Sequence, residues 1–225
     1  MKGYGQFCPV SKAAEILSER WMLLIIRELL MGSTRFTQLQ RGLGRISPSV
    51  LSDRLRRLVD NDVIFRERTA DGWEYRVTEC GMALKPVIDA AGLWGYRWLR
   101  NEFAAEELDI DLLMLDISRR VRTDRIRGEQ AVIEFEFTDV SGRYRLWWLL
   151  VDGGEAELCL DHPGREVNLV LRATVETVAR IWMDRLSVAT ARRNKLLEIQ
   201  GERRLRSNLS EWLSQSYVSE LATEK

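Results

Sequence analysis

Apolar residues in the first hundred positions recur every three or four residues, the spacing that places them on one side of a helix. Three helices are expected in succession, over residues 11–20, 21–31 and 36–43. The second is strongly apolar, and the Gly32-Ser33 pair ends it. This part of the chain is therefore predicted to be mainly helical.

The next helix is expected over residues 47–61 and has a well-marked start. Ser47 is a good N-cap, and Pro48 suits the first helical position, where its missing N–H costs nothing. On a helical wheel the apolar stripe consists of Leu51, Leu55 and Leu58. Serines and arginines occupy the other sides, so the polar surface of this helix is the first candidate for function.

A hairpin follows this helix. Two strand-like runs, 63–69 and 73–78, flank Ala70-Asp71-Gly72, and Asp-Gly between such runs is a strong hairpin signal. Residues 79–100 then return to a helical pattern. Three helices, a fourth with a polar face and a hairpin, in that order, predict a winged helix-turn-helix over residues 1–100.

From about residue 101 the pattern changes. In 131–137 the residues alternate, with Ile133, Phe135 and Phe137 on one face and two glutamates on the other. Further strands are expected within 144–151, 153–160, 166–173 and 192–201, and helices over 173–186 and 202–213. We predict an α+β chain of two domains. The second, 101–225, is expected to be an antiparallel sheet covered by helices.

Net charge is zero over the whole chain, but the two parts differ. Residues 1–100 carry a net charge of +5 and the remainder −5, which favours an anionic partner for the first domain. No apolar run approaches the ~18 residues of a membrane span, and no signal-peptide pattern occurs, so we expect a cytoplasmic protein without membrane contact. Three widely spaced cysteines suggest neither disulfides nor a metal site, and no cofactor is expected.

Arginines before, on and after the helix 47–61 could face DNA. In a helix lying in the major groove, N-terminal residues reach base edges and arginines reach guanines or phosphates. The alternative is an ordinary solvated amphipathic helix. This alternative is less well supported because the neighbouring hairpin also carries arginines, Arg66 included. Taking the hairpin, over residues 66–76, to contact the DNA backbone, we expect DNA contacts from Arg35, Arg45, Ser47, Ser49, Ser52, Asp53, Arg54, Arg56, Arg57, Arg68 and Arg76.

Ordered motifs over residues 7–97 resemble the HxlR-type family of bacterial winged-helix transcription regulators. They are Cys8-Pro9-Val10, Trp21, Arg27-Glu28-Leu29-Leu30, Arg35-Phe36, Ile46-Ser47-Pro48, Leu51-Ser52-Asp53-Arg54-Leu55, Tyr75-Arg76-Val77-Thr78 and Gly81. The resemblance implies a homodimer, formed through the N-terminal segment and the helix after the hairpin, that reads a pseudo-palindromic operator. It also places Cys8 where some family members sense oxidants. A structural role for Cys8 is the competing interpretation.

The second domain contains no catalytic grouping, because its one histidine, His162, has no nucleophile beside it in the sequence. We therefore expect no enzymatic activity. The order of elements over 110–215 resembles a sterol-carrier-protein-like domain, which implies an apolar ligand tunnel. A candidate ligand pocket consists of Phe135, Phe137, Trp147, Trp148, Leu158, Leu171 and Trp182. The competing interpretation is that these side chains form the domain's core.

Three functions follow from these patterns. The first is a homodimeric DNA-binding transcription regulator modulated by an apolar small molecule in its second domain. The second is a redox-sensing regulator that works through Cys8. The third is a lipid-binding carrier protein whose winged domain serves for dimerisation.

Overall fold

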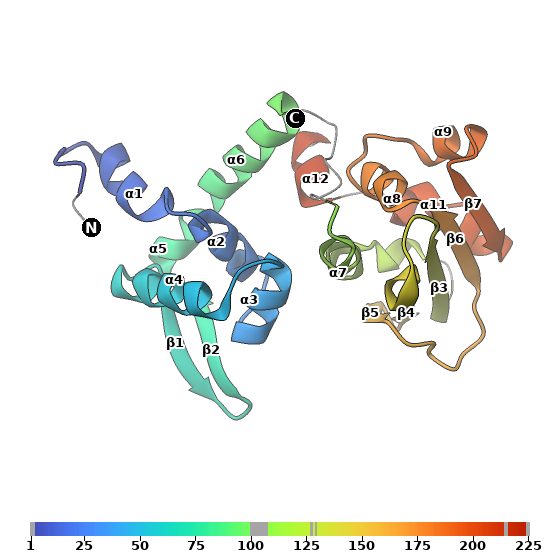
Figure 1. Ribbon diagram of the computed structural model, residues 1–225, viewed down its shortest axis with the longest axis horizontal. Helices are drawn as coiled ribbons and strands as arrows, with labels where there is room; N and C mark the ends of the chain where they lie inside the picture. Colours follow the sequence, from blue (N-terminus) through green and yellow to red (C-terminus); the bar gives the residue numbers. More distant parts are fainter. Residues whose placement is uncertain (1–2, 100–107, 127, 129, 214–215, 224–225) are drawn as a thin grey trace. The chain divides into compact units, whose positions relative to one another are not determined.

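The computed structural model describes the whole chain except residues 1–2, 100–107, 127, 129, 214–215 and 224–225 (Figure 1). It divides into two compact units, Met1–Gly92 and Leu93–Lys225. The expected domains, 1–100 and 101–225, remain predictions in their boundaries. None of the helices in the described part of the chain is long and apolar enough to span a membrane.

The first unit contains short helices and one hairpin. Its elements are α1 (Pro9–Leu17), α2 (Met22–Leu30), α3 (Phe36–Leu43), α4 (Pro48–Asp60), β1 (Ile64–Thr69), β2 (Gly72–Val77) and α5 (Glu79–Met82). A further helix, α6 (Lys85–Trp98), begins in this unit. Figure 1 shows the hairpin β1–β2 extending from the helices as an arm. The expected helix-turn-helix and hairpin are thus present.

One local expectation for this unit is wrong. Trp21 lies before α2 rather than within it, with a left-handed backbone (φ 82°). This conformation turns the chain between α1 and α2, so the helix begins at Met22. The side chains of Met22, Ile25 and Ile26 are all fully buried and anchor α2 in the core of the unit.

The second unit is a five-stranded sheet with helices. Its elements are α7 (Ile110–Arg120), β3 (Gln130–Phe137), β4 (Leu146–Asp152), β5 (Glu155–Cys159), β6 (Leu169–Ala173), α8 (Val175–Trp182), α9 (Val188–Arg193), β7 (Leu197–Gly201), α10 (Arg203–Arg206), α11 (Leu209–Trp212) and α12 (Tyr217–Thr223). Short 3₁₀ turns span Thr123–Arg125 and Gly142–Arg145. Residues 102–107, at the start of the expected second domain, lie outside the described part of the chain.

The expectation of an antiparallel sheet is wrong at one strand pair. The strand order is β5-β4-β3-β6-β7, and β3 runs parallel to β6 while the other neighbouring strands are antiparallel. After β5, residues 160–168 carry the chain across to the free edge of β3. Such a crossover lets the next strand enter in the same direction as its neighbour, whereas a tight turn would reverse it.

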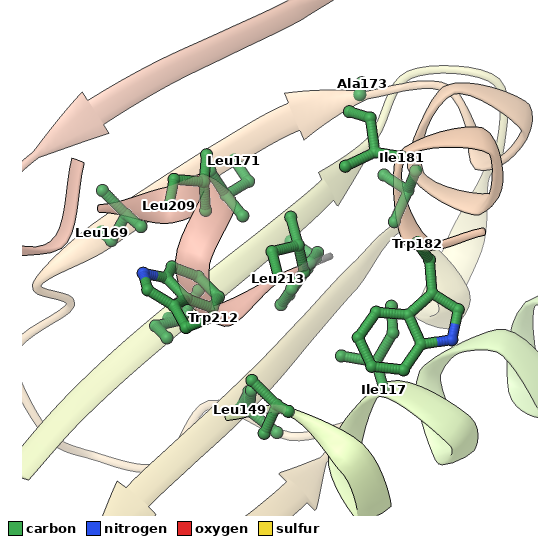
Figure 2. Close-up of a cluster of buried hydrophobic side chains, with 14 of the residues drawn as sticks. Ile117, Leu149, Leu169, Leu171, Ala173, Ile181, Trp182, Leu209, Trp212 and Leu213 are labelled. Carbon is green, nitrogen blue, oxygen red and sulfur yellow. The ribbon is translucent and has the colours of Figure 1, made fainter. Parts of the chain in front are cut away.

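The core of the second unit lies between the sheet and its helices. Figure 2 shows Leu209, Trp212 and Leu213, from α11 and the residue after it, close to Leu169 and Leu171 on β6. Trp182 of α8 and Ile117 of α7 belong to the same cluster. The alternation expected in β3 is confirmed, because Ile133, Phe135 and Phe137 are buried in this core.

Candidate nucleic-acid interface

Helix α4 is held by one side and open on the other. Its first turn is capped by the Ser47 hydroxyl, which accepts a hydrogen bond from the Val50 N–H (3.4 Å). The buried side consists of Leu51, Leu55 and Leu58, at most 1% exposed. The exposed side carries Ser49, Ser52 and Arg56. A helix arranged in this way can present small hydroxyls and a guanidinium to a partner without leaving the core.

Two of the expected contact arginines are held within the unit. Arg54 Nε lies 3.4 Å from a carboxylate oxygen of Glu19 and donates to the Arg20 carbonyl (3.2 Å). Arg57 pairs with the same Glu19. Because Glu19 lies on the connection between α1 and α2, these ion pairs attach α4 to that connection. Arg54 and Arg57 are only 21% and 30% exposed, so a tertiary role accounts for both side chains.

Arg56 is the arginine of α4 that faces solvent, with 70% of its side chain exposed. Its nearest carboxylate is Asp53, at 3.9 Å, and Asp53 also pairs with Arg54 at 2.6 Å. Arg45 is exposed in the turn before α4. Arg56 is therefore the residue on this helix best placed to reach outward.

The hairpin has two different faces, because residues alternate along each strand. The first, which we call the ion-pair face, carries Glu67, Glu74 and Arg76, and it continues onto Arg35 and Asp71. Arg35 lies 3.1 Å from Asp71 and 3.6 Å from Glu74. Arg76 pairs with Glu67 and, at 3.0 Å, with Glu74. Three carboxylates thus neutralise two guanidinium groups.

The second face of the hairpin, the aromatic face, carries Arg66, Arg68, Trp73 and Tyr75. The Arg66 guanidinium lies 4.1 Å from the centre of the Trp73 ring and 5.8 Å from that of Tyr75. Arg68 is exposed and directly opposite Trp73 in the strand register. No carboxylate lies on this face between residues 64 and 77, all of which are described.

Sequence reasoning placed the arginines of the hairpin together and missed this separation. Arg68 was expected to act with Arg35 and Arg76, whereas the structure puts it on the opposite face from them. Trp73 was not proposed as a site residue. The signal that could have found it is the two-residue alternation combined with the hairpin register, which sets Trp73 among arginines.

The expected pocket residues of the second unit are mainly in its core. Phe135, Phe137, Trp147, Leu171 and Trp182 are at most 2% exposed. Leu158 packs against the same cluster. Trp147 and Trp148 lie on opposite faces of the sheet, as expected for neighbours in a strand, and the Trp148 ring meets the His162 ring edge-on at 5.4 Å. Aromatic side chains therefore occupy the space between sheet and helices.

A cavity of about 590 Å³ lies elsewhere in the second unit, beside Glu136, Arg145 and Arg172. Arg172 lies 2.8 Å from the Glu136 carboxylate and Arg145 lies 2.5 Å from it. Hydrogen bonds from Arg172, and then from Arg145, hold the pKa of Glu136 below its usual value despite burial. This cluster joins β3 and β6 to the 3₁₀ turn Gly142–Arg145 that precedes β4.

Cys8 is the N-cap residue of α1, and its thiol is free and partly exposed. The nearby Lys12 is engaged with Glu15, at 3.2 Å. Its ammonium group therefore gives little support to a special reactivity of Cys8.

The model of the family described as HxlR-like helix-turn-helix matches residues 16–103. The match therefore includes α2, α3, α4 and the hairpin. It ends before the sheet of the second unit.

Two curated bacterial proteins and one solved structure are similar to the same part of the chain. The HTH-type transcriptional regulator YvaP of Bacillus subtilis (strain 168) is 37% identical over 102 residues, which are 44% of this chain and 94% of that protein. The HTH-type transcriptional regulator Mb3122 of Mycobacterium bovis is 42% identical over 93 residues, 40% of this chain and 58% of that protein. The reduced form of the transcriptional regulator YodB from B. subtilis is 28% identical, with a TM-score of 0.38, over 44% of this chain and all of YodB.

Proposed function

Because the chain belongs to the HxlR-like helix-turn-helix family, we propose that it is a homodimeric, DNA-binding transcription regulator. The observation that carries the proposal is the exposed side of α4. Ser49, Ser52 and Arg56 project from a helix whose three leucines are locked in the core. Such a helix can enter a major groove as a rigid body, with its capped N-terminus toward the bases.

The contacts to DNA divide into two groups. Ser49, Ser52, Asp53 and Arg56 are assigned to base edges, with Ser47 and Arg45 beside the phosphates near the helix start. A bidentate arginine–guanine pair contributes about 1–3 kcal/mol of discrimination, so Arg56 is the main candidate for sequence reading. Arg54 and Arg57 act mainly by holding α4 in place through Glu19.

The test is selection of binding sites from random double-stranded DNA with the purified full-length protein, followed by a salt series. A regulator recovers a two-fold-related sequence, and its affinity falls steeply as salt rises because bound phosphates release counterions. Arg56→Ala should weaken binding to the selected DNA by about 10–100-fold. Recovery of no sequence, with equal binding by wild type and Arg56→Ala, would reject the proposal.

The homodimer is supported by large apolar side chains exposed to solvent. In the first unit Phe7 is 99% exposed, with Tyr4 and Val10 also open; on α6, Trp94 and Trp98 are 58% and 75% exposed. Exposed apolar side chains that are grouped, as here within 4–10 and at an i, i+4 spacing on α6, mark interaction surfaces, whereas single ones do not. Light scattering on wild type, Phe7→Glu and Trp98→Glu checks this, since either substitution should shift the mass toward the monomer.

The second domain is assigned a modulating role, in which an apolar ligand entering between sheet and helices changes DNA affinity. A ligand has this effect only if it binds the two states of the protein unequally. The sterol-carrier-like resemblance supports such a ligand, whereas the tightly packed aromatic residues require displacement of side chains. Equal DNA affinity with and without a fluorescent fatty-acid probe bound would count against this role.

Two other functions would account for different results of these tests. Helix N-termini are among the environments in which reactive thiols occur, and the position of Cys8 there favours a redox-sensing regulator. A lipid-binding carrier is the result if the protein binds an apolar probe and fails to select DNA.

A further inference from the structure

We infer that the hairpin meets DNA with its aromatic face, and that Trp73 is a positioning residue which holds Arg66 for entry into the minor groove beside α4. This inference rests on the proposed DNA-binding function. It replaces the expectation that Arg35, Arg68 and Arg76 contact DNA together.

The charges on the two faces decide which of them suits DNA. The ion-pair face, with Arg35 and Asp71, carries three carboxylates against two guanidinium groups. To bring it against phosphates, its own pairs would have to break. The aromatic face carries Arg66 and Arg68 with no carboxylate, so it attracts phosphates without that cost.

Trp73 prepares Arg66 for binding. A free arginine side chain loses rotamer freedom when it is fixed against DNA, and stacking on a ring removes part of this loss in advance. The guanidinium lies 4.1 Å from the Trp73 ring centre, within cation–π range, and the ring remains 50% exposed. A stacked guanidinium keeps its in-plane N–H groups free to donate outward.

The hairpin is fixed relative to α4, so Arg66 takes a defined position on the DNA when α4 lies in the major groove. Only three residues, 61–63, separate α4 from β1. The Thr78 N–H donates to the Val63 carbonyl (3.1 Å), and the Tyr75 N–H donates to the Thr34 carbonyl (2.7 Å). The first bond closes the base of the hairpin, and the second joins β2 to the segment before α3. A further bond, from the Val63 N–H to the Leu58 carbonyl (3.0 Å), joins the base of the hairpin to α4.

The hairpin is also long enough to reach the minor groove beside α4. Six extended residues span about 20 Å, and the major groove is about 12 Å wide, so an arm that starts at the end of α4 reaches across one DNA backbone. The minor groove lies there. Arginine is favoured in narrow, A·T-rich minor grooves, where the negative potential is enhanced.

The experiment uses the full-length protein and the DNA sequence obtained by selection, with flanks of three kinds: A·T, G·C and inosine·cytosine. An inosine·cytosine pair keeps the major-groove pattern of G·C but lacks the guanine amino group in the minor groove. We expect wild type to bind A·T and inosine·cytosine flanks alike, and about tenfold more tightly than G·C flanks, a typical effect of one discriminated base pair.

Variants of the two faces provide the controls. Arg66→Ala should abolish the flank preference. Trp73→Ala should reduce it severalfold, and Trp73→Phe, which keeps a ring for stacking, should retain most of it. Arg76→Ala, on the ion-pair face, should leave the preference unchanged. Circular dichroism of each variant confirms that the hairpin variants are folded.

Each contrary result has a defined meaning. Loss of the preference in Arg76→Ala and not in Arg66→Ala assigns contact to the other face and overturns the inference. A uniform loss of affinity in Arg66→Ala, with a salt slope lower by about one, makes Arg66 a phosphate contact and overturns the minor-groove assignment. If selection recovers no sequence and Arg56→Ala binds DNA like wild type, the proposed function itself has failed, which is a separate outcome.

Discussion

The Glu19 carboxylate lies 3.4 Å from Nε of Arg54, joining the α1–α2 connection to the helix proposed to read DNA. Glu19 is only 15% exposed and pairs with Arg57 as well. One carboxylate therefore binds two guanidinium groups, from residues three positions apart on the same side of α4. The orientation of that helix depends on a residue 35 positions earlier in the chain.

We expect Glu19→Gln to destabilise the protein by about 1–2 kcal/mol, because partly buried pairs contribute more than surface pairs and less than fully buried ones. A double-mutant cycle with Arg54→Ala should show coupling between the two sites. Urea denaturation at pH 7 provides the measurement. Glu15→Gln, which weakens the pair of a more exposed carboxylate (26%) with Lys12, should change the midpoint less. Additive effects of Glu19→Gln and Arg54→Ala would show that the pair is not formed.

Substitutions of Arg54 and Arg56 should have different effects, one on stability and the other on DNA binding. Arg54→Ala is expected to lower the free energy of unfolding, since it removes contacts to Glu19 and to the Arg20 carbonyl. Arg56→Ala should leave unfolding unchanged, because its side chain is 70% exposed, and should weaken binding to selected DNA. Urea titrations paired with fluorescence anisotropy test both variants. The reverse assignment of the two effects would contradict the placement of these side chains.

The Glu136 cluster predicts acid sensitivity of the second domain. Hydrogen bonds from Arg172 and Arg145 keep the pKa of Glu136 lower in the folded state than in the unfolded chain. The ionised Glu136 carboxylate therefore contributes fully to the free energy of unfolding above the unfolded-state pKa of about 4.3. This contribution is lost as the pH falls through the lower pKa of the folded state. Glu136→Gln should flatten the dependence of the unfolding midpoint on pH between about 5 and 3. Identical pH profiles for wild type and Glu136→Gln would show that the cluster does not stabilise the fold.

Trp147 tests whether the second domain is packed or open. Its side chain is fully buried, so Trp147→Ala should cost about 3–5 kcal/mol, the range for loss of a large core side chain. Trp73→Ala, at a half-exposed ring, is the matched control and should cost little. Denaturation followed by circular dichroism measures both. A loss below about 1 kcal/mol for Trp147→Ala would indicate an open compartment and would favour ligand binding there.

Cys8 distinguishes the redox-sensing regulator from the main proposal. With Lys12 engaged by Glu15, we expect Cys8→Ser to bind selected DNA like wild type, both before and after treatment with the thiol oxidant diamide. Gel-shift assays of the two proteins with and without oxidant give the comparison. Loss of DNA binding on oxidation in wild type, absent in Cys8→Ser, would instead establish a thiol switch.

The elements that depend on neighbouring residues could be read from the sequence. The Ser47-Pro48 start of α4, the hairpin around Asp71 and the alternation of β3 are all present. In each case the determining residues lie within one helical turn or one strand pair. The opposite directions of Trp147 and Trp148 follow from the same local geometry.

The tertiary structure decided which polar residues remain available for function. Arg54 and Arg57 are held by Glu19, and Arg35 and Arg76 by carboxylates of the hairpin, whereas Arg56 and Arg66 face outward. An arginine in a sequence carries the same charge in each case. Its availability depends on its partners, which lie one strand away for Arg76 and 38 residues away for Arg57, whose partner is Glu19. The parallel pairing of β3 with β6 has the same cause, because the path of residues 160–168 is set by packing of the whole domain and not by any local pattern.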